Sequence, residues 1–305
     1  MKKTLFLYSI LLVLFSANAQ QIQWANKLIK FSSDLGGKQH GIKRILGRPD
    51  VFPQGGSSPN AWTPKNALDG YEWVQVGFEK PQTVKQVAVF DTAFHQTMPP
   101  RAYRSAIPKE MYTQLGIRAY GFHGSSHQYV SRKANEYLNI PEPKIITIHL
   151  GNGSSMTAIK NGKSIDHSMG LGPMGGLVMG TRCGDIDPSI IFHLIHERGY
   201  TSKEVNDILN KKSGLLGLCG YSDMRDVKQA ISDGNEDAKL AYELYAYRIQ
   251  KYIGTFSAAL NGLDAIIFTA GIGENDAEMR AAVCQDMEFF GIYLDPEKNA
   301  KLKSD

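Results

Sequence analysis

The chain has 305 residues, 42% of them apolar, and a formal net charge of +4 at pH 7. This length and composition indicate an ordinary soluble globular chain that can bury a large core and hold two or more domains. The lysines and arginines are interspersed, so the charge gives no case for nucleic-acid binding, whereas a phosphate-bearing small molecule fits equally well. Cys183, Cys219 and Cys284 lie far apart without metal-ligand spacing, and we expect them to be reduced thiols.

Residues 1–19 have the pattern of a signal peptide. Lys2 and Lys3 precede an apolar run over residues 5–15, and the small residues 16–19, SANA, form a cleavage site of the A-x-A type. The apolar run is too short for a membrane span. This pattern predicts export of residues 20 onward.

Residues 20–86 are rich in Trp, Gly and Pro and show turn signals without a long helical period. The segment YEWVQVGFEKPQTVKQVAVF, residues 71–90, alternates well enough for two antiparallel strands separated by residues 79–81. This strand pair resembles the discoidin-like modules of secreted bacterial proteins. We therefore predict a short, β-sandwich-like fragment of the secreted type over residues 20–86.

After residue 87, strands and helices alternate. Residues 201–204, TSKE, have capping-box spacing and predict a helix that closes at residues 213–214. Apolar positions at helical spacing over residues 240–260 predict a long helix that stops at residues 261–262, Asn-Gly.

A strand, a glycine turn and a helix then follow in that order. The strand is AIIFTAG, residues 265–271, and the helix is predicted through MRAAVCQDMEFF, residues 279–290, ending at Gly291. This order indicates an α/β nucleotide-binding domain. The change from the secreted-type texture to this domain falls inside a predicted strand at residue 87, not in an exposed linker.

Three motifs are interpreted without a ligand. NGKS at residues 161–164 lacks the first glycine of a Walker A loop and predicts a type I′ hairpin turn. Residues 170–175 fit G-x-G-x-x-G in letters, but they follow a hairpin and open no evident helix, which argues against a dinucleotide site. His123 and His127 are four residues apart, but they have no acidic partner for a zinc helix.

Two apolar strands each run into a glycine-rich turn, HLGNGSS at residues 149–155 and FTAGIGEN at residues 268–275. Glycine lets the main chain approach an anion, so that backbone N–H groups converge on phosphate oxygens. The first turn is also explained by a tight hairpin alone. The second opens a helix, and a helix N-terminus favours phosphate. Together the two turns predict a nucleotide phosphate held between them.

Six segments in this order resemble acetate kinase and cover residues 87–299. By this resemblance the fold is α/β, a partial ribonuclease-H-like duplicated ATPase fold of the acetate kinase type. The implied domains are the remainder of a first domain at residues 87–144 and a nucleotide-binding second domain at residues 145–305. The segments are VAVFDTAFHQTMP (87–99), YGFHGSSH (120–127), HLGNGSS (149–155), DHSMGLGPMGGLVMGTRCGDIDP (166–188), SDMRD (222–226) and FTAGIGEN (268–275).

The resemblance implies the site residues. Asp91, His123 and Arg182 fall on the family's catalytic positions, and Phe122 and Pro173 fall on its acyl pocket. No metal ligand is assigned in this chain, although ATP and Mg²⁺ are the implied cofactors. The implied partner is acetate or another short carboxylate, with a homodimer as the assembly. The implied nucleotide-binding residues are His149, Leu150, Gly151, Asn152 and Gly153 in the first loop, Asp223, Met224 and Arg225 in the second, and Gly271, Ile272, Gly273, Glu274 and Asn275 in the third.

The chemistry supports these roles independently. A carboxylate is already ionised at neutral pH and needs no strong general base, so the difficulty is bringing an anion to the γ-phosphate. Arg182 and His123 would offset that repulsion, and Asp91 would orient Arg182 or a metal-bound water. The alternatives are a structural ion pair of Arg182 with Asp185 or Asp187, and a purely structural role for His123.

The chain also departs from the family pattern. It lacks the family's N-A-G-S-S-S, R-x-x-H-G-G and T-N-E-E segments, which carry a metal-side asparagine, a substrate arginine and a magnesium-linked glutamate. We therefore expect weak or absent activity in this truncated chain. Three alternatives stay open: an exported β-sandwich binding module with a non-functional kinase passenger, a propionate or butyrate kinase, and a recombination product. A functional kinase belongs in the cytoplasm, where ATP is found, whereas the leader predicts export.

Overall fold

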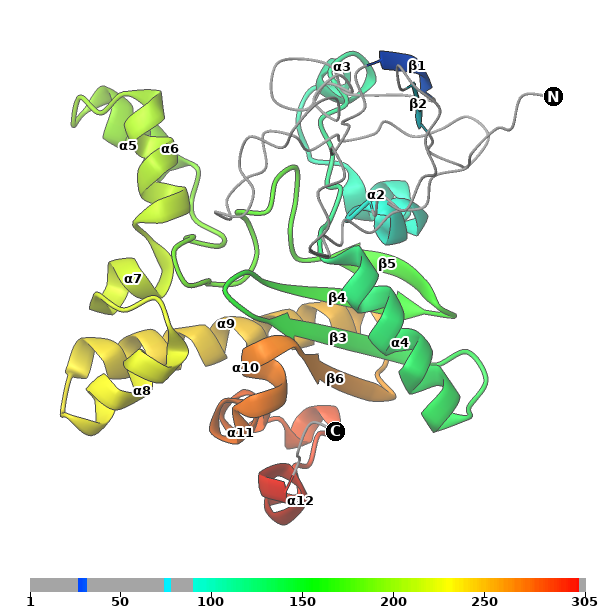
Figure 1. The fold of residues 1–305 in the computed structure, drawn as a ribbon, viewed down its shortest axis with the longest axis vertical. Coiled ribbons are helices and arrows are strands. Elements are labelled where there is room, and N and C mark those ends of the chain that lie inside the picture. Colours follow the sequence, from blue (N-terminus) through cyan, green and yellow to red (C-terminus); the bar gives the residue numbers. More distant parts are fainter. Residues whose placement is uncertain (1–26, 32–73, 78–89, 302–305) are drawn as a thin grey trace, which may run out of the picture. The chain divides into compact units, whose positions relative to one another are not determined.

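The structure, a computed structural model, describes residues 27–31, 74–77 and 90–301 (Figure 1). The predicted signal peptide and most of the predicted 20–86 fragment lie outside these residues. Within that fragment, β1 (Lys27–Phe31) and β2 (Val74–Gly77) pair antiparallel. β2 falls in the first of the two strands predicted over residues 71–90, while the second lies outside the described residues.

Contacts divide the chain into two compact units. The first comprises Met1–Ala93 and Ala106–Ile117, and its described part includes α3 (Lys109–Thr113). The second comprises Phe94–Ser105 and Arg118–Asp305 and holds the other helices described below. The predicted domain boundaries at residues 19, 86 and 144 stay predictions.

The second unit is built on a four-stranded mixed sheet in the order β5-β4-β3-β6. β3 (Lys144–Leu150) pairs antiparallel with β4 (Ser154–Lys160) and parallel with β6 (Ala265–Thr269), and β5 (Lys163–His167) pairs antiparallel with β4. β3 and β4 are apolar and buried along almost their whole length because helices cover both faces of the sheet. The α/β fold predicted from the sequence is therefore confirmed.

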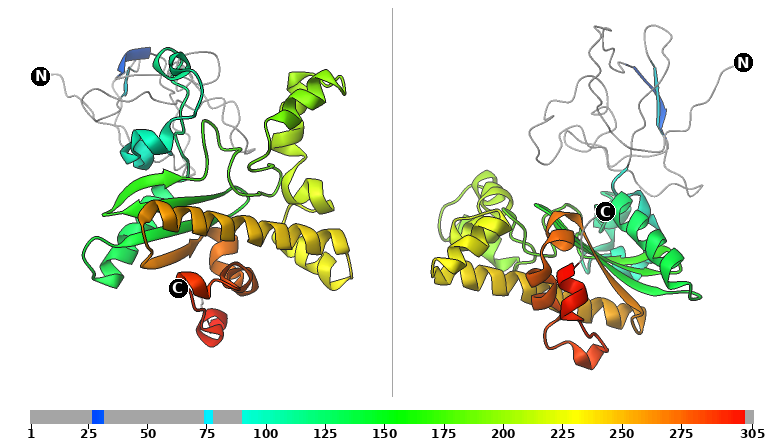
Figure 2. Two further views of the ribbon diagram at one scale, coloured as in Figure 1. Left: turned by 180° about the vertical axis from the view of Figure 1, so that it is seen from behind. Right: turned by 60° about the horizontal axis from the view of Figure 1, so that its bottom comes forward.

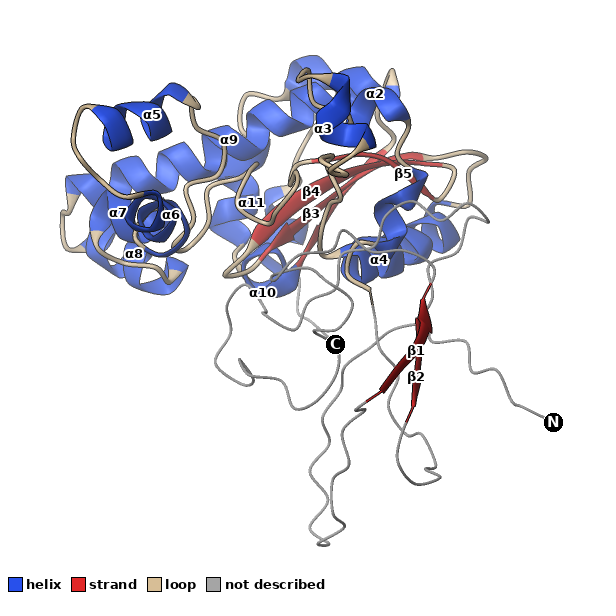
Figure 3. Ribbon diagram, turned by 90° about the horizontal axis from the view of Figure 1, so that it is seen from above, coloured by secondary structure: helices blue, strands red, loops and turns tan. Residues whose placement is uncertain are grey.

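The two faces of the sheet are covered by helices from different parts of the chain (Figure 3). α4 (Gly124–Leu138) packs on β3 and β6, over a small core of Phe94, Ile145 and Ile159. α9 (Glu236–Leu260) crosses the opposite face along β3, β4 and β5, as the view from behind shows (Figure 2). Its buried side includes Tyr245, Ile249 and Phe256 of the main core.

The remaining helices of the second unit surround this centre. Among the helices that the structure describes, none is both long and apolar enough to cross a membrane. They are η2 (Ala93–Thr97), α2 (Pro100–Tyr103), α5 (Ser189–His196), α6 (Ser202–Lys211), α7 (Gly214–Cys219), α8 (Met224–Ser232), α10 (Ala270–Asn275), α11 (Ala277–Cys284), η3 (Glu288–Phe290) and α12 (Pro296–Lys301).

Several local sequence signals are confirmed. Thr201 and Glu204 form a complete capping box at the start of α6. Asn161 and Gly162 both have positive φ, as a type I′ turn requires. Asn261 ends α9 in the left-handed conformation, with φ 54°.

Two helix ends differ from the prediction. The helix predicted to continue to Gly291 ends at Cys284, and Asp286 then takes a positive φ that a helix does not allow. Gly214 does not close α6, which ends at Lys211, but begins α7. Both differences lie at the C-terminal end of a helix, beyond its last apolar residues at helical spacing. Tertiary packing decides the backbone path there.

Candidate active site

Gly153 lies where the side chains of His123 and Arg182 meet. It belongs to the turn that joins β3 to β4, and Gly151 N–H donates to the Gly153 carbonyl at 3.1 Å. A Cβ atom on Gly153 would lie 3.4 Å from His123 Nε2 and 3.5 Å from Arg182 Nη2. The fold therefore brings two of the three predicted catalytic residues to the first glycine turn.

Arg182 is held by a main-chain group and not by an acidic partner. Its Nη1 donates to the carbonyl oxygen of Pro173 at 2.7 Å, which connects a predicted pocket residue to the guanidinium. Asp185 binds instead to the amide of Gly176, and Asp187 accepts from Ser189 N–H. Partial burial lowers the pKa of Arg182. The alternative of an Arg182 ion pair with either aspartate is wrong for the described structure.

His123 is placed by an unusual backbone conformation at the start of α4. Its φ is 55°, in the left-handed region that non-glycine residues enter at some cost. The preceding carbonyl, of Phe122, accepts from His95 Nε2 at 2.9 Å and from His167 Nε2 at 2.8 Å. These two buried rings fix the peptide that carries His123.

The environment of the His123 ring keeps it neutral. Burial, and then the nearby charge of Arg182, lower its pKa to about 4. The ring stacks on His149 of β3, with centroids 4.2 Å apart and an interplanar angle of 22°. His149 Nδ1 in turn lies 2.9 Å from the Ser126 hydroxyl of α4. A neutral, stacked imidazole offers a hydrogen bond at this turn instead of a second positive charge.

The turn at Gly153 is joined to a second loop, residues 179–182, and to the start of α8. Gly180 N–H donates to the Asn152 carbonyl at 3.3 Å. A Cβ atom on Gly180 would lie 2.6 Å from Asn152 Oδ1 and 2.9 Å from the Ser222 carbonyl. Only a glycine fits here, so Gly180 allows three loops to converge.

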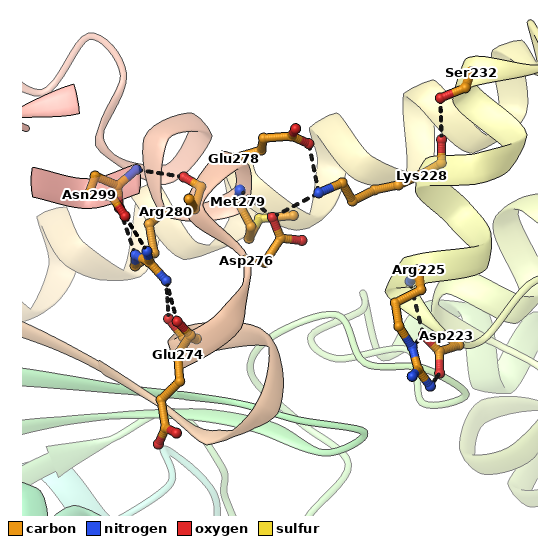
Figure 4. Close-up of polar contacts among 12 residues, drawn as sticks. Asp223, Arg225, Lys228, Ser232, Glu274, Asp276, Glu278, Met279, Arg280 and Asn299 are labelled. Carbon is orange, nitrogen blue, oxygen red and sulfur yellow. Dashed lines mark hydrogen bonds and ion pairs between the residues drawn. The ribbon is translucent and has the colours of Figure 1, made fainter. Parts of the chain in front are cut away.

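The second predicted nucleotide loop caps α8. Asp223 Oδ1 accepts from Arg225 N–H at 2.9 Å, and its carboxylate pairs with the Arg225 side chain (Figure 4). The hydrogen bonds from Arg225 lower the pKa of Asp223 to about 2. Met224 is buried in the main core, so its side chain serves packing. Asp223 and Arg225 are the exposed groups of this loop.

The third predicted nucleotide loop begins a helix, and one of its own carboxylates lies at the helix start. Residues 270–275 form the short helix α10, and the Glu274 carboxylate accepts from Ala270 N–H and from the Thr269 hydroxyl, both at 3.2 Å. Gly273 packs on the backbone of β6 and β3, whereas Gly271 has open space around its Cα. The Glu274 carboxylate thus engages one backbone amide at the start of α10, that of Ala270.

Two hollows of the second unit lie away from these residues. One, of about 1130 Å³, is bounded by α8, α9 and α11, and another, of about 440 Å³, by β6, α11 and residues 290–299. Neither is lined by His123, Arg182 or the turn at Gly153. The candidate site is therefore assigned on its polar groups and not on a hollow.

The family model of the acetokinase family matches residues 65–305, well over half of the sequence. The chain belongs to the acetokinase family. This match begins upstream of the change in texture at residue 87. It accounts for why the six motifs occur together and in order.

Named relatives agree with this family. An acetate kinase of Flavobacterium johnsoniae is 60% identical over 226 residues, which are 74% of this chain and 57% of that protein. An acetate kinase of Oleidesulfovibrio alaskensis is 54% identical over 233 residues, 76% of this chain and 58% of that protein. The chain thus spans a little more than half the length of the curated relatives it matches.

Solved structures show the same fold. The crystal structure of Porphyromonas gingivalis acetate kinase matches with a TM-score of 0.70 and 49% identity, over 72% of this chain and 56% of that one. A propionate kinase from Francisella tularensis matches with a TM-score of 0.69 and 49% identity, over 70% of this chain and 56% of that one.

The described contacts of Asp91 and Phe122 do not bring their side chains to the Gly153 turn in the way that they bring His123 and Arg182. Asp91 is exposed and belongs to the first compact unit, so its catalytic role stays a prediction. Phe122 is half-buried, and its carbonyl anchors the peptide before His123. Its place in an acyl pocket with Pro173 also stays a prediction.

Sequence reasoning missed several residues that support the site. His127 and Ser155 lie behind His123, and Gly180 joins two loops. A signal for His127 was present, because residues four apart on a helix lie on one face, here the face of α4 that meets the sheet. It was interpreted only as a failed zinc motif.

Arg280 is a buried cation that holds α10 in place (Figure 4). Its Nη1 donates to the carbonyls of Gly273 and Glu274 at 3.0 and 2.7 Å. Its Nε and Nη2 donate to the side chain and carbonyl of Asn299 at 2.7 and 2.9 Å. The guanidinium therefore ties the C-terminal end of α10 to α12.

Replacing Arg280 by methionine should lower the free energy of unfolding by about 2–3 kcal/mol, because buried carbonyls lose a charged donor. Urea titration followed by circular dichroism measures this change. Lys298→Met is the control, since that cation on α12 has an 87% exposed side chain and should cost little. Equal stability of the two variants would show that Arg280 is not a structural support.

Proposed function

We propose that this chain transfers the γ-phosphoryl group of ATP to acetate, reversibly, giving acetyl phosphate and ADP. The observation that carries the proposal is the meeting of Arg182 and His123 at the Gly153 turn, in a member of the acetokinase family. The chain spans a little more than half the length of its relatives, so the activity of the whole protein is part of this proposal.

In this reaction a carboxylate oxygen forms a bond to the γ-phosphorus, while the bond from that phosphorus to the bridging oxygen of ADP breaks. The attacking group is already an anion, so no side chain needs to remove a proton. Arg182 neutralises charge on the transferring group, and neutral His123 donates a hydrogen bond to one of its oxygens. Asp91 keeps the catalytic role that the family pattern implies.

The nucleotide is proposed to lie along the three loops. The main chain of residues 149–153 approaches the phosphates, where glycine permits close contact. Asp223 and Arg225 present exposed polar groups at the start of α8. In the third loop, residues 271–275, we propose that the nucleotide approaches the main chain at Gly271, which has open space around it. The amide of Ala270 is already engaged by the Glu274 carboxylate.

Mg²⁺ would reach such a site mainly on the phosphates of ATP, as this ion commonly does. Among residues 90–301, no three His, Cys, Asp or Glu side chains are grouped to hold a metal ion. The donor set of the described residues does not fit a protein-held Mg²⁺, and we assign it no step.

Acetate is the proposed acceptor, and propionate is the second candidate because a propionate kinase matches with 49% identity. Discrimination between them rests on about 1–3 kcal/mol per methylene group. Butyrate is the third candidate acceptor. Phe122 and Pro173 are the pocket residues that we propose to favour a short chain. Use of ATP places this function in the cytoplasm, and a homodimer is the proposed assembly.

The test is calorimetric titration of the full chain with ATP and ADP, together with a hydroxamate assay for acetyl phosphate. Arg182→Ala should reduce turnover about 10²–10³-fold, as loss of one stabilising group at a transition state does. Arg198→Ala, at an exposed arginine after α5, is the control and should leave turnover unchanged. Absence of adenine-nucleotide binding by the wild-type chain would overturn the proposal.

A further inference from the structure

A continuous series of buried hydrogen bonds ends on the His123 ring. Thr147 Oγ1 lies 2.7 Å from His127 Nδ1, and His127 Nε2 lies 2.8 Å from Ser155 Oγ. Ser155 Oγ lies 2.8 Å from His123 Nδ1. We call Thr147, His127 and Ser155 the relay; they come from β3, α4 and β4, and all three are 0% exposed.

The direction of the relay follows from the Thr147 hydroxyl. Among the described residues, its hydrogen-bond partner is His127 Nδ1, and the hydroxyl of Thr157, its register partner on β4, has no partner at all. If His127 carried its proton on Nδ1, the Thr147 hydroxyl proton would be buried without an acceptor, which costs about 1–3 kcal/mol. Thr147 therefore donates, and His127 carries its proton on Nε2.

The remaining links then have one arrangement. His127 Nε2–H donates to Ser155, so the Ser155 hydroxyl gives its own proton to His123 Nδ1. In a neutral imidazole one nitrogen accepts and the other donates, so His123 Nε2 carries the proton. That nitrogen is the atom that approaches Gly153 beside Arg182.

Hydrogen-bond partners also determine the tautomers of the neighbouring histidines. His167 Nδ1 accepts from Met169 N–H at 2.8 Å, while its Nε2 lies 2.8 Å from the Phe122 carbonyl and 3.3 Å from Phe122 N–H, so the shorter contact favours a proton on Nε2. His95 donates from Nε2 to that same carbonyl, which leaves its Nδ1 to accept from Ser164 at 2.9 Å. Burial lowers the pKa of all of these rings and keeps them neutral near pH 7.

We propose that Thr147, His127 and Ser155 are positioning residues that hold His123 as its Nε2–H tautomer, so that a donor and not a lone pair meets an anionic phosphoryl oxygen. The identity of that oxygen rests on the proposed function, whereas the tautomer rests on the relay alone. The consequence is physical: a lone pair facing an anion repels it, while an N–H oriented in advance stabilises it without reorganisation. The relay therefore orients an N–H donor toward the anion while the His123 ring stays neutral.

The first measurement is nuclear magnetic resonance of the full chain labelled with ¹⁵N in its histidine rings, near pH 7.5 and without nucleotide. His123→Gln and His127→Gln assign the signals. Both rings should show Nε2–H and an unprotonated Nδ1. A proton on Nδ1 of either ring would overturn the relay. The two variants serve only to assign the signals, and the tautomer itself is measured in the wild-type chain.

The second measurement is the titration of His123 in Ser155→Ala and in the wild type, in sucrose, an osmolyte that stabilises the folded state and so keeps the chain folded to lower pH. In the relay, the Ser155 hydroxyl donates to Nδ1 and so opposes protonation there, and its removal should raise the pKa of His123. A relay running the other way would have Ser155 accept from Nδ1–H, and its removal would then lower that pKa. An unchanged or lowered pKa overturns the proposal.

Thr157→Val is the matched control for the loss of a buried hydroxyl on β4. Thr157 is 0% exposed, lies two residues from Ser155 and has no hydrogen-bond partner, so the His123 tautomer and titration should match those of the wild type. These readings are independent of nucleotide binding. If these readings agree with the relay but the chain does not bind ATP, the tautomer assignment holds and only the proposed function is wrong.

Discussion

Lowering the pH from about 7 to about 4.5 should remove most of the stability of this protein, because three buried histidines and the half-buried His123 stay neutral in the fold. Burial lowers the pKa of His95 and His123 to about 4 and that of His127 and His167 well below the ordinary value. In the unfolded chain each ring takes up a proton near pH 6.5. Acid therefore favours the unfolded state.

The sign and size follow from proton linkage. The folded pKa lies below the unfolded one, so the contribution is fully present above about pH 6.5 and is lost as the pH falls toward 4. A shift from 6.5 to about 4 in His95 and in His123 corresponds to about 3 kcal/mol for each ring. Such losses are comparable with the whole stability of a domain, about 5–15 kcal/mol.

Other charges near these rings modify the effect. The positive charge of Arg182 lowers the pKa of His123 further and acts in the same direction. Burial raises the pKa of the Asp166 carboxyl beside His167, so its protonation favours the folded state and opposes the loss at the acid end. The loss of stability should therefore begin near pH 6.5 and be steepest near pH 5, between the unfolded and the folded pKa values of these rings.

Urea unfolding at a series of pH values measures this curve. His95→Gln should make it shallower by about 1.4 kcal/mol per pH unit in this range, since one titrating ring is removed. His196→Gln is the control, because His196 is exposed on α5 and should leave the shape of the curve unchanged. A free energy of unfolding that stays constant from pH 7 to pH 5 would contradict the prediction.

The elements that the sequence predicted well are those set by local rules. The capping box at Thr201, the Asn161-Gly162 turn and the stop of α9 at Asn261 each depend on a few neighbouring residues. α4 was missed because its sequence, GSSHQYVSRKANEYL, has a weak apolar pattern, and packing on β3 and β6 supports it.

The sequence predicted the residues of the candidate site but not the residues that position them. Resemblance to a family named His123 and Arg182, and the structure brings both to Gly153. The relay depends on hydrogen bonds between side chains that the fold brings together from three elements, for which a single sequence has no local signal.

Gly214→Ala should strongly destabilise the protein, because the added methyl group would collide with backbone atoms. Gly214 begins α7 with φ +63°, and a Cβ atom there would lie 2.1 Å from the Met179 carbonyl oxygen and 2.7 Å from that of Arg182. Both contacts are with backbone, which cannot turn aside as a flexible side chain does. The loop that carries Arg182 must therefore move.

The expected loss is about 1–2 kcal/mol for a left-handed alanine and about 1–3 kcal/mol more for the collision. Gly220→Ala separates the two terms, because Gly220 ends the same helix with φ +84° and has nothing within 4 Å of the added atom. It should show only the conformational loss.

Urea unfolding of both variants gives the difference, and calorimetric titration with ATP tests whether the displaced Arg182 loop still supports nucleotide binding. Equal stabilities would mean that the backbone around Met179 yields to the added atom. A large excess loss in Gly214→Ala, together with weakened ATP binding, would show that close packing of α7 on this loop sets the position of the guanidinium.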